Sequence, residues 1–319
     1  MIFSEICVIF LIGVGIVWWR RLSKRSKRRG KGISILVPFQ FNDKNNQRWK
    51  NWEWLRAYWE SHLPEAEIII GNDYVSLETG VPFSKACAVN NAASRASGDV
   101  FVIVDADGFI PIESIIKSTE EIRKAERKNK KLWYIPYRHF YRLSQCASQE
   151  LLKSSPENPY VFPESMSDKQ LQTTTGHQMG HWFGALIHIV SRKAFEEVGG
   201  WDTRFRGWGS EDIAAIMAFD TLYWPHKTID ARVFHIWHPM FSSDGGLDDW
   251  VDGKHRVWEG QKNNAVNDTL AGRYYGARCN IKKMRDLVNE GLPIYKEDPE
   301  LEIIEIIEEL EWIIEERSI

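Results

Sequence analysis

Apolar and polar positions after residue 32 alternate between short β-branched runs and segments with helical spacing. The runs at 33–37, 67–71 and 100–104 predict buried strands. Residues 49–63 place Trp and Leu every three or four positions and predict a helix with an aromatic face, and residues 84–96 predict a second helix. This β-α-β-α-β order predicts an α/β domain with a parallel sheet.

The three predicted strands end in polar residues. Ligands of open α/β sheets bind beyond the carboxyl ends of the strands, so these ends predict one shared crevice. Neither GxGxxG after the first strand nor GxxxxGK[ST] is present, which disfavours dinucleotide binding and a P-loop. The crevice residues are expected in Pro38-Phe39-Gln40, Asn72-Asp73 and Asp105-Ala106-Asp107.

Length and hydrophobic content favour one large catalytic domain, which we place at 33–295. The chain has 319 residues, 43% of them hydrophobic, and a net charge of -3. Basic residues crowd into 20–31, so the rest of the chain is acidic, which argues against a nucleic-acid partner. Cysteines after residue 31 show no metal-ligand spacing and fit free thiols in a reducing compartment.

The N-terminal segment predicts a membrane anchor at 1–19, followed by a basic juxtamembrane linker at 20–32. Residues 2–19 are apolar except for Ser4 and Glu5, and the basic residues follow the apolar stretch instead of preceding it as in a signal peptide. We therefore expect a membrane-associated protein that contacts the bilayer through residues 1–31, with a cytoplasmic catalytic domain. A stretch of roughly 25 Å at about 1.5 Å per residue is short for a bilayer, so spanning and monotopic placement both stay open.

The C-terminal segment, 296–319, predicts an acidic amphipathic helix. Ile and Leu recur on one face and Glu on the other. This helix either docks on the catalytic domain or mediates self-association.

Two motifs carry the chemistry. Asp105 and Asp107 flank Ala106 at a strand end, where carboxylates and a diphosphate can share one hard cation. Further on, Gly199-Gly-Trp-Asp-Thr-Arg-Phe205 leads into Arg206-Gly-Trp-Gly-Ser-Glu-Asp212. Together these segments resemble the GT-A glycosyltransferases over roughly residues 33–240. The second motif is similar to Trp-Gly-Gly-Glu-Asp of β-1,4-galactosyltransferases and Trp-Gly-Gly-Glu-Asn of polypeptide N-acetylgalactosaminyltransferases.

The resemblance implies a GT-A fold, a Rossmann-like nucleotide-diphospho-sugar transferase with a mixed sheet flanked by helices. Ser210 stands where these families have a second Gly, a change that the turn accepts where φ is negative. The resemblance also implies that Asp105 and Asp107 hold Mn²⁺ or Mg²⁺ against the donor diphosphate, with Asp105 also contacting the donor nucleotide.

The resemblance further implies that a histidine from a later strand completes the metal site. His235 and His238 are both available, and in a strand their odd separation would send the rings to opposite faces. By analogy with the Val-Gly-His segment of the polypeptide N-acetylgalactosaminyltransferases, we favour His235 as the metal ligand. A structural role for a lone histidine is the alternative.

The acidic pair Glu211 and Asp212 would act on the substrates. By the resemblance, Trp208 stacks on a sugar, Glu211 binds hydroxyl groups, and Asp212 is the general base that takes the acceptor proton. The competing interpretation is that both acids only begin a helix, where negative charge suits the helix dipole.

Further donor contacts follow from the same resemblance. Phe39, Gln40 and Asp73 would receive the nucleobase and ribose. Lys85, in a segment similar to that of family 2-like transferases, would approach the diphosphate, although a solvated lysine at a helix start is a close alternative. Trp182 and Gly184 would face the donor sugar.

The sequence thus predicts a metal-dependent hexosyltransferase. It would move a sugar from a nucleotide diphosphate donor, with a UDP-sugar preferred, to the hydroxyl of a glycan, lipid-linked or protein acceptor. Asp212 favours inversion, whereas a retaining transferase stays open. Two competing hypotheses are an inactive carbohydrate-binding protein on the same fold and a nucleotidyltransferase, which would release pyrophosphate.

Overall fold

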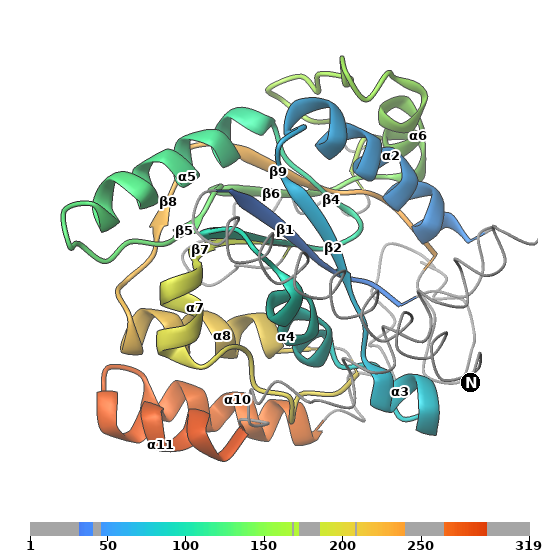
Figure 1. Cartoon of the computed structure of the whole chain (residues 1–319). Coiled ribbons are helices and arrows are strands. Elements are labelled where there is room, and N and C mark those ends of the chain that lie inside the picture. Colours follow the sequence, from blue (N-terminus) through green and yellow to red (C-terminus); the bar gives the residue numbers. More distant parts are fainter. Residues whose placement is uncertain are drawn as a thin grey trace, which may run out of the picture.

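The computed structural model describes residues 32–40, 46–167, 169–171, 186–207, 209–239 and 265–291. A six-stranded sheet lies at its centre, in the order β2-β1-β3-β7-β5-β8 (Figure 1). β1 runs parallel to β2 and β3, as predicted, but β7 pairs antiparallel with β3 and β5. The mixed sheet of the predicted fold class is therefore confirmed. The strands are β1 (Ile33–Pro38), β2 (Glu67–Gly71), β3 (Val100–Val104), β5 (Tyr134–Ile135), β7 (Ile187–Ser191) and β8 (Lys227–Thr228).

A second, three-stranded sheet lies next to the carboxyl end of β3. Its order is β4-β9-β6, from β4 (Gly108–Phe109), β9 (Arg232–His235) and β6 (His139–Arg142). β4 begins directly after Asp107, and its Gly108 is the register partner of His235. This pairing brings a segment from far along the chain to the end of the central strand.

Helices cover both faces of the large sheet (Figure 1). Helices α2 and α5 lie on one side, and α4, α7 and α8 lie on the other. Helices α10 and α11 contact α8 and form an outer layer. The helices are α2 (Gln47–His62), α3 (Tyr74–Thr79), α4 (Lys85–Arg95), α5 (Ile112–Glu126), α6 (Gln145–Lys153), α7 (Arg192–Val198), α8 (Glu211–Leu222), α10 (Ala265–Ala277) and α11 (Ile281–Gly291).

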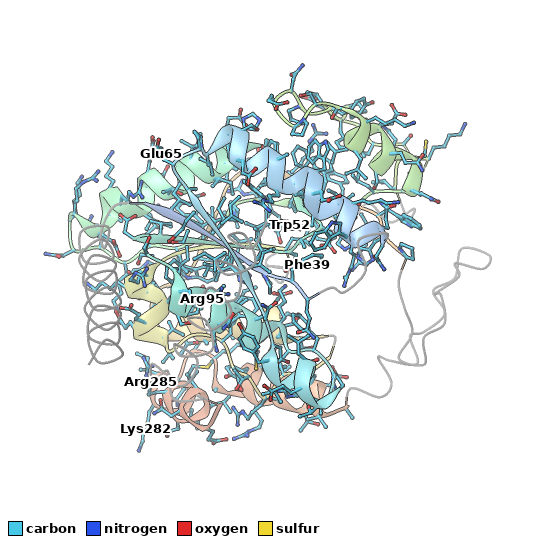
Figure 2. The ribbon with its side chains drawn as sticks, turned by 45° about the vertical axis from the view of Figure 1, so that its right-hand side comes forward. Phe39, Trp52, Glu65, Arg95, Lys282 and Arg285 are labelled. Atoms are coloured by element: carbon cyan, nitrogen blue, oxygen red, sulfur yellow. The ribbon has the colours of Figure 1, made fainter. Side chains whose placement is uncertain are left out.

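The aromatic face predicted for residues 49–63 is the buried face of α2. The Asn46 side chain caps the helix by accepting from the Arg48 amide. Trp52 and Trp59 are buried, and the Trp52 ring lies 6.2 Å from that of Phe39 at the end of β1 (Figure 2). Because buried aromatic rings contribute strongly to packing, this contact fixes α2 against the sheet. The first turn of α2, with Arg48, is thereby fixed as well.

The second predicted helix, at 84–96, is α4. It approaches the end of β2 so closely that a Cβ on Gly71 would lie 1.9 Å from the Ala88 carbonyl oxygen. Only glycine fits at such a contact. The Ser84 side chain caps α4 by accepting from the Cys87 amide. These contacts place Lys85, the first residue of α4, at the carboxyl end of the sheet.

The prediction of a membrane-associated protein with a cytoplasmic catalytic domain is contradicted. In the part of the chain that the structure describes, no helix combines the length and apolar character needed to cross a bilayer. The segment predicted as an anchor, residues 1–19, lies outside the described residues, as do most of the linker and the C-terminal helix at 296–319. Between β5 and β7 the described residues also form β6 and α6.

Candidate active site

A tight turn after β3 separates the two acids of the Asp-Ala-Asp motif. The Asp105 amide donates to the Leu186 carbonyl, and the Gly108 amide donates back to the Asp105 carbonyl. The Asp107 carbonyl accepts from the Ile236 amide, just beyond β9. Each carboxylate then joins a different group of side chains.

Asp105 shares one ammonium group with Asp212. The Lys85 Nζ lies 2.7 Å from Asp105 Oδ1 and 2.8 Å from Asp212 Oδ1. It also lies 5.6 Å from the centre of the Trp201 ring. The Lys85 side chain is only 13% exposed, so it is not a solvated lysine at a helix start. We call Lys85, Asp105, Glu211 and Asp212 the lysine cluster.

The charges in the lysine cluster do not balance. Burial, together with Asp212 and Asp107, raises the pKa of Asp105 to about 7 although Lys85 opposes the shift. Burial and the Asp212 charge likewise raise the pKa of Glu211 to about 7. Burial would lower the pKa of Lys85, but Asp105, Asp212 and Glu211 raise it above its usual value. One ammonium faces three acids, so the cluster retains a proton on a carboxyl group near neutral pH.

Glu211 and Asp212 are also the first two residues of α8, so they begin a helix as the competing interpretation expected. The positive end of the helix dipole and the Lys85 ammonium both attract negative charge on Glu211 and Asp212. Ser210, before them, has a φ of 71°, which is the left-handed region. The negative φ at which the turn would accept a serine is therefore not observed, and the serine carries a strain of order 1 kcal/mol that glycine would avoid.

Asp107 joins two histidines and an arginine. His238 Nε2 lies 3.2 Å and His235 Nε2 3.8 Å from the Asp107 carboxylate, and Arg48 Nη2 lies 3.5 Å from it. Burial would raise the pKa of Asp107, but His235, His238 and Arg48 hold it well below its usual range. We call Asp107, His235 and His238 the histidine cluster.

The histidine cluster has donor atoms that suit a divalent metal. Burial lowers the pKa of His235 to about 3, so its ring is neutral at neutral pH, the form that binds metals. His235 Nδ1 is buried and has no hydrogen-bond partner among the described residues. One carboxylate oxygen and one nitrogen of each ring lie within 4.8 Å of one another. The residues therefore fit the implied metal ion.

This grouping differs from the expected set of Asp105, Asp107 and His235. β9 ends at His235, so the alternation that would have sent the two rings to opposite faces does not continue to His238. The ring centres lie 5.1 Å apart. Asp105 lies with Lys85 instead. Sequence reasoning also missed Arg48, which no motif marks.

The other expected donor residues that the structure describes have other partners. Phe39 is buried against the Trp52 ring, and Gln40 links the end of β1 to α3 through Ser76 and the Asp73 amide. The Asp73 carboxylate is buried and accepts from the Ser76 and Ser84 amides and from Arg206, 3.0 Å away. Trp182, Gly184 and Trp208 lie outside the described residues.

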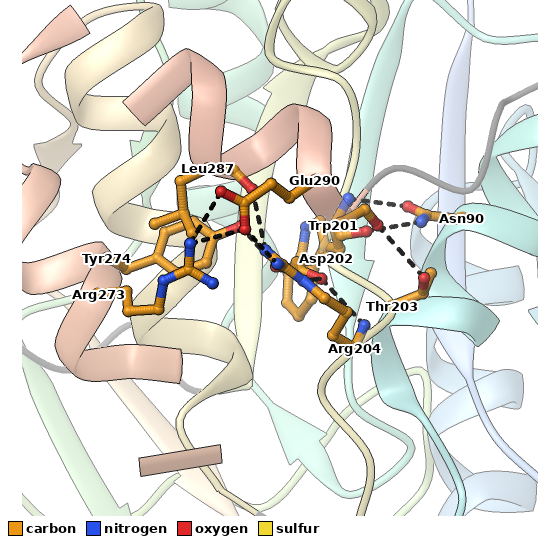
Figure 3. Close-up of polar contacts among 10 residues, drawn as sticks. Asn90, Trp201, Asp202, Thr203, Arg204, Arg273, Tyr274, Leu287 and Glu290 are labelled. Atoms are coloured by element: carbon orange, nitrogen blue, oxygen red, sulfur yellow. Dashed lines mark hydrogen bonds and ion pairs between the residues drawn. The ribbon is translucent and has the colours of Figure 1, made fainter. Parts of the chain in front are cut away.

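The first half of the second motif has a packing role (Figure 3). The Asn90 side chain bonds both the amide and the carbonyl of Trp201, and the buried Asp202 carboxylate accepts from Arg204 and the Tyr274 hydroxyl. Arg204 also reaches Glu290 of α11. The motif thus attaches α10 and α11 to the segment that carries Trp201, whose ring faces Lys85.

Residues 66–223 match the family model described as Glycosyltransferase like family 2. No curated protein sequence matches the chain. A crystal structure of the Drosophila β-1,4-galactosyltransferase 7 catalytic domain with xylobiose is 15% identical, over 66% of this chain and 72% of that chain, with a TM-score of 0.38.

Two further solved structures are similar at the same remote level. Glucosyl-3-phosphoglycerate synthase of Mycobacterium tuberculosis, solved with Mn²⁺, UDP and glucosyl-3-phosphoglycerate, is 12% identical, over 79% of this chain and 81% of that chain, with a TM-score of 0.39. GalNAc-T7, solved with UDP, GalNAc and Mn²⁺, is 13% identical, over 81% and 48%, with a TM-score of 0.38. The family match confirms the predicted resemblance to glycosyltransferases: residues 66–223 match a glycosyltransferase family 2-like model, and the protein is a glycosyltransferase.

Proposed function

We propose that the protein moves a sugar from a nucleotide diphosphate donor, most simply a UDP-sugar, to an acceptor hydroxyl with inversion at the anomeric carbon. The observation that carries this proposal is the pair of clusters at the end of β3. The histidine cluster offers metal ligands, and Asp212 lies 2.8 Å from Lys85 in the adjoining lysine cluster. A donor diphosphate between them would meet cations from both sides.

Asp107, His235 and His238 would hold Mn²⁺ or Mg²⁺, which when bound supplies positive charge to the departing diphosphate. Asp212 would accept the proton of the acceptor hydroxyl as its oxygen bonds to the anomeric carbon. The bond from that carbon to the diphosphate oxygen breaks in the same step, and the nucleoside diphosphate leaves with the electron pair. Lys85 would orient Asp212 and carries positive charge that can face the leaving group.

Other predicted roles remain proposals. Asp105, in the lysine cluster, would contact the donor, and Glu211 would bind substrate hydroxyls. Phe39, Gln40 and Asp73 would surround the nucleobase and ribose. Trp182, Gly184 and Trp208 would contact the sugars. The acceptor would be a glycan, a lipid-linked sugar or a protein.

Calorimetric titration of the full chain tests the donor site. UDP and GDP are titrated with and without Mn²⁺ into the wild type, Asp107→Ala and the control Asp230→Ala, whose side chain is 76% exposed. We expect metal-dependent binding of one diphosphate to the wild type and the control and its loss in Asp107→Ala. Equal binding by Asp107→Ala would remove the metal role of the histidine cluster.

Product analysis tests the reaction itself. Incubation with labelled UDP-sugars and mixed glycan, lipid and protein acceptors should release UDP and give a product with inverted anomeric configuration by NMR. Release of pyrophosphate would indicate nucleotidyl transfer. Retained configuration would exclude the single displacement through Asp212, and metal-dependent binding without turnover against all acceptors would favour a carbohydrate-binding protein.

A further inference from the structure

Arg48 contacts two residues of the histidine cluster, His238 and Asp107. Its Nη2 lies 3.2 Å from His238 Nε2 and 3.5 Å from Asp107 Oδ2. The side chain comes from the first turn of α2 and is 45% exposed, whereas Asp107 is 7% exposed at its side chain. A surface arginine thus reaches inward to a buried acid.

The tautomer of His238 shows what the arginine binds. His238 Nδ1 lies 2.9 Å from the Pro239 carbonyl oxygen, which can only accept a hydrogen bond, so Nδ1 carries the proton. The other ring nitrogen, Nε2, faces Arg48 Nη2 and lies 3.2 Å from Asp107 Oδ2.

A metal ion held by the histidine cluster would need the same atoms. Metal-binding histidines usually donate the second ring nitrogen to a carbonyl or carboxylate, as His238 does. A metal ion bound to His238 Nε2 and Asp107 would need the place that the Arg48 guanidinium takes beside these two atoms. Two adjacent positive charges would also repel each other.

We propose that Arg48 is a displaceable counter-cation of the metal site, which holds His238 and Asp107 together and leaves when a divalent metal binds to them. The proposal rests on the metal-binding role of the histidine cluster in the proposed function. Exposure of the side chain gives Arg48 a path to solvent. Lys85, at 13% exposure and between two acids, has no comparable freedom.

The test is calorimetric titration of Mn²⁺ alone, without nucleotide, into the full chain. Arg48→Ala should bind Mn²⁺ about three- to tenfold more tightly than the wild type, because the metal no longer displaces a charge-assisted contact. Arg56→Ala is the matched control, since Arg56 is on the same helix, 60% exposed and paired with Glu60. Its Mn²⁺ affinity should stay within about twofold. Circular dichroism confirms that each variant is folded.

The sign of the change decides the matter. Weaker Mn²⁺ binding by folded Arg48→Ala would make the arginine a positioning residue and overturn the inference, and so would unchanged affinity. If the wild type binds no Mn²⁺ and Asp107→Ala behaves identically, the metal site of the proposed function fails, and this inference fails with it. Binding by the wild type with no gain in Arg48→Ala overturns only the role of Arg48.

Discussion

Asp105 and Asp107 are two residues apart and have opposite surroundings. Asp105 lies with Asp212 against an enclosed lysine, and burial raises its pKa to about 7. Asp107 lies against two imidazole rings and a half-exposed arginine, and these neighbours hold its pKa well below the usual range. One acid is in a group that retains a proton, and the other is in a group that attracts cations.

One turn thus presents two kinds of chemistry. Lys85 comes from α4 on one side of the sheet, whereas the histidines arrive through β9 and its pairing with β4. The pKa of each carboxylate is set by the side chains that the neighbouring element brings to it. We therefore expect substitutions in the lysine cluster and in the histidine cluster to fail in different ways.

The largest effect is expected for Asp212→Asn. Loss of the proposed base should lower kcat by about 10²- to 10⁴-fold. Metal-dependent UDP binding should stay within about twofold, because Asp212 belongs to the lysine cluster. Steady-state kinetics and calorimetry on the same sample measure both quantities. A parallel loss of UDP affinity would show that the two clusters act as one unit.

Lys85→Met should cause the next largest effect. It leaves three acids without their shared cation in a site where Lys85 is 13% exposed, and breaking a buried pair costs about 3–5 kcal/mol of unfolding free energy. The control is Lys131→Met, which breaks an exposed pair with Glu197 and should cost at most about 1 kcal/mol. Urea unfolding measures both. Equal small losses would mean that Lys85 does not offset the cluster's charge.

The sequence is informative where structure is local. The β-branched run before Asp105 predicts β3, and the spacing of Trp residues predicts the buried face of α2. The clusters depend on contacts between distant segments, such as Arg48 with His238, 190 positions apart. No periodicity encodes such a contact, because it depends on which strands pair.

The prediction for His235 and His238 shows that sequence periodicity does not determine such contacts. Alternation along a strand predicts opposite faces for His235 and His238, but the strand ends at His235 and the alternation does not continue to His238. The Asp-Ala-Asp spacing likewise cannot show that the turn sends its two acids to different neighbours. Strand termination and turn geometry, set by hydrogen bonds from Ile236 and Gly108, decide both cases.

The two histidines offer a sharper test of the histidine cluster. His235→Ala and His238→Ala should each weaken Mn²⁺ binding by at least about tenfold, because each removes one of three candidate ligands. His139→Ala is the control, since His139 pairs with the exposed Asp230. Calorimetry with Mn²⁺ measures the effect. A loss confined to His235→Ala would restore the single-histidine site that the sequence favoured.

The smallest effect is expected in the pH dependence of stability. Burial raises the pKa of Glu211 from 4.5 to about 7, so between these values the folded protein binds more protons at this site than the unfolded chain. The contribution of Glu211 is therefore fully present below pH 4.5 and is lost as the pH rises through 7. Glu211→Gln does not titrate, so its stability relative to the wild type should rise from pH 5 to pH 8, by an amount on the order of 1 kcal/mol.

Urea unfolding at several pH values measures this slope, with the exposed Glu60→Gln as the control. A flat difference would place the retained proton of the lysine cluster on another carboxyl group, and a falling one would mean that Glu211 is charged and stabilised by Lys85.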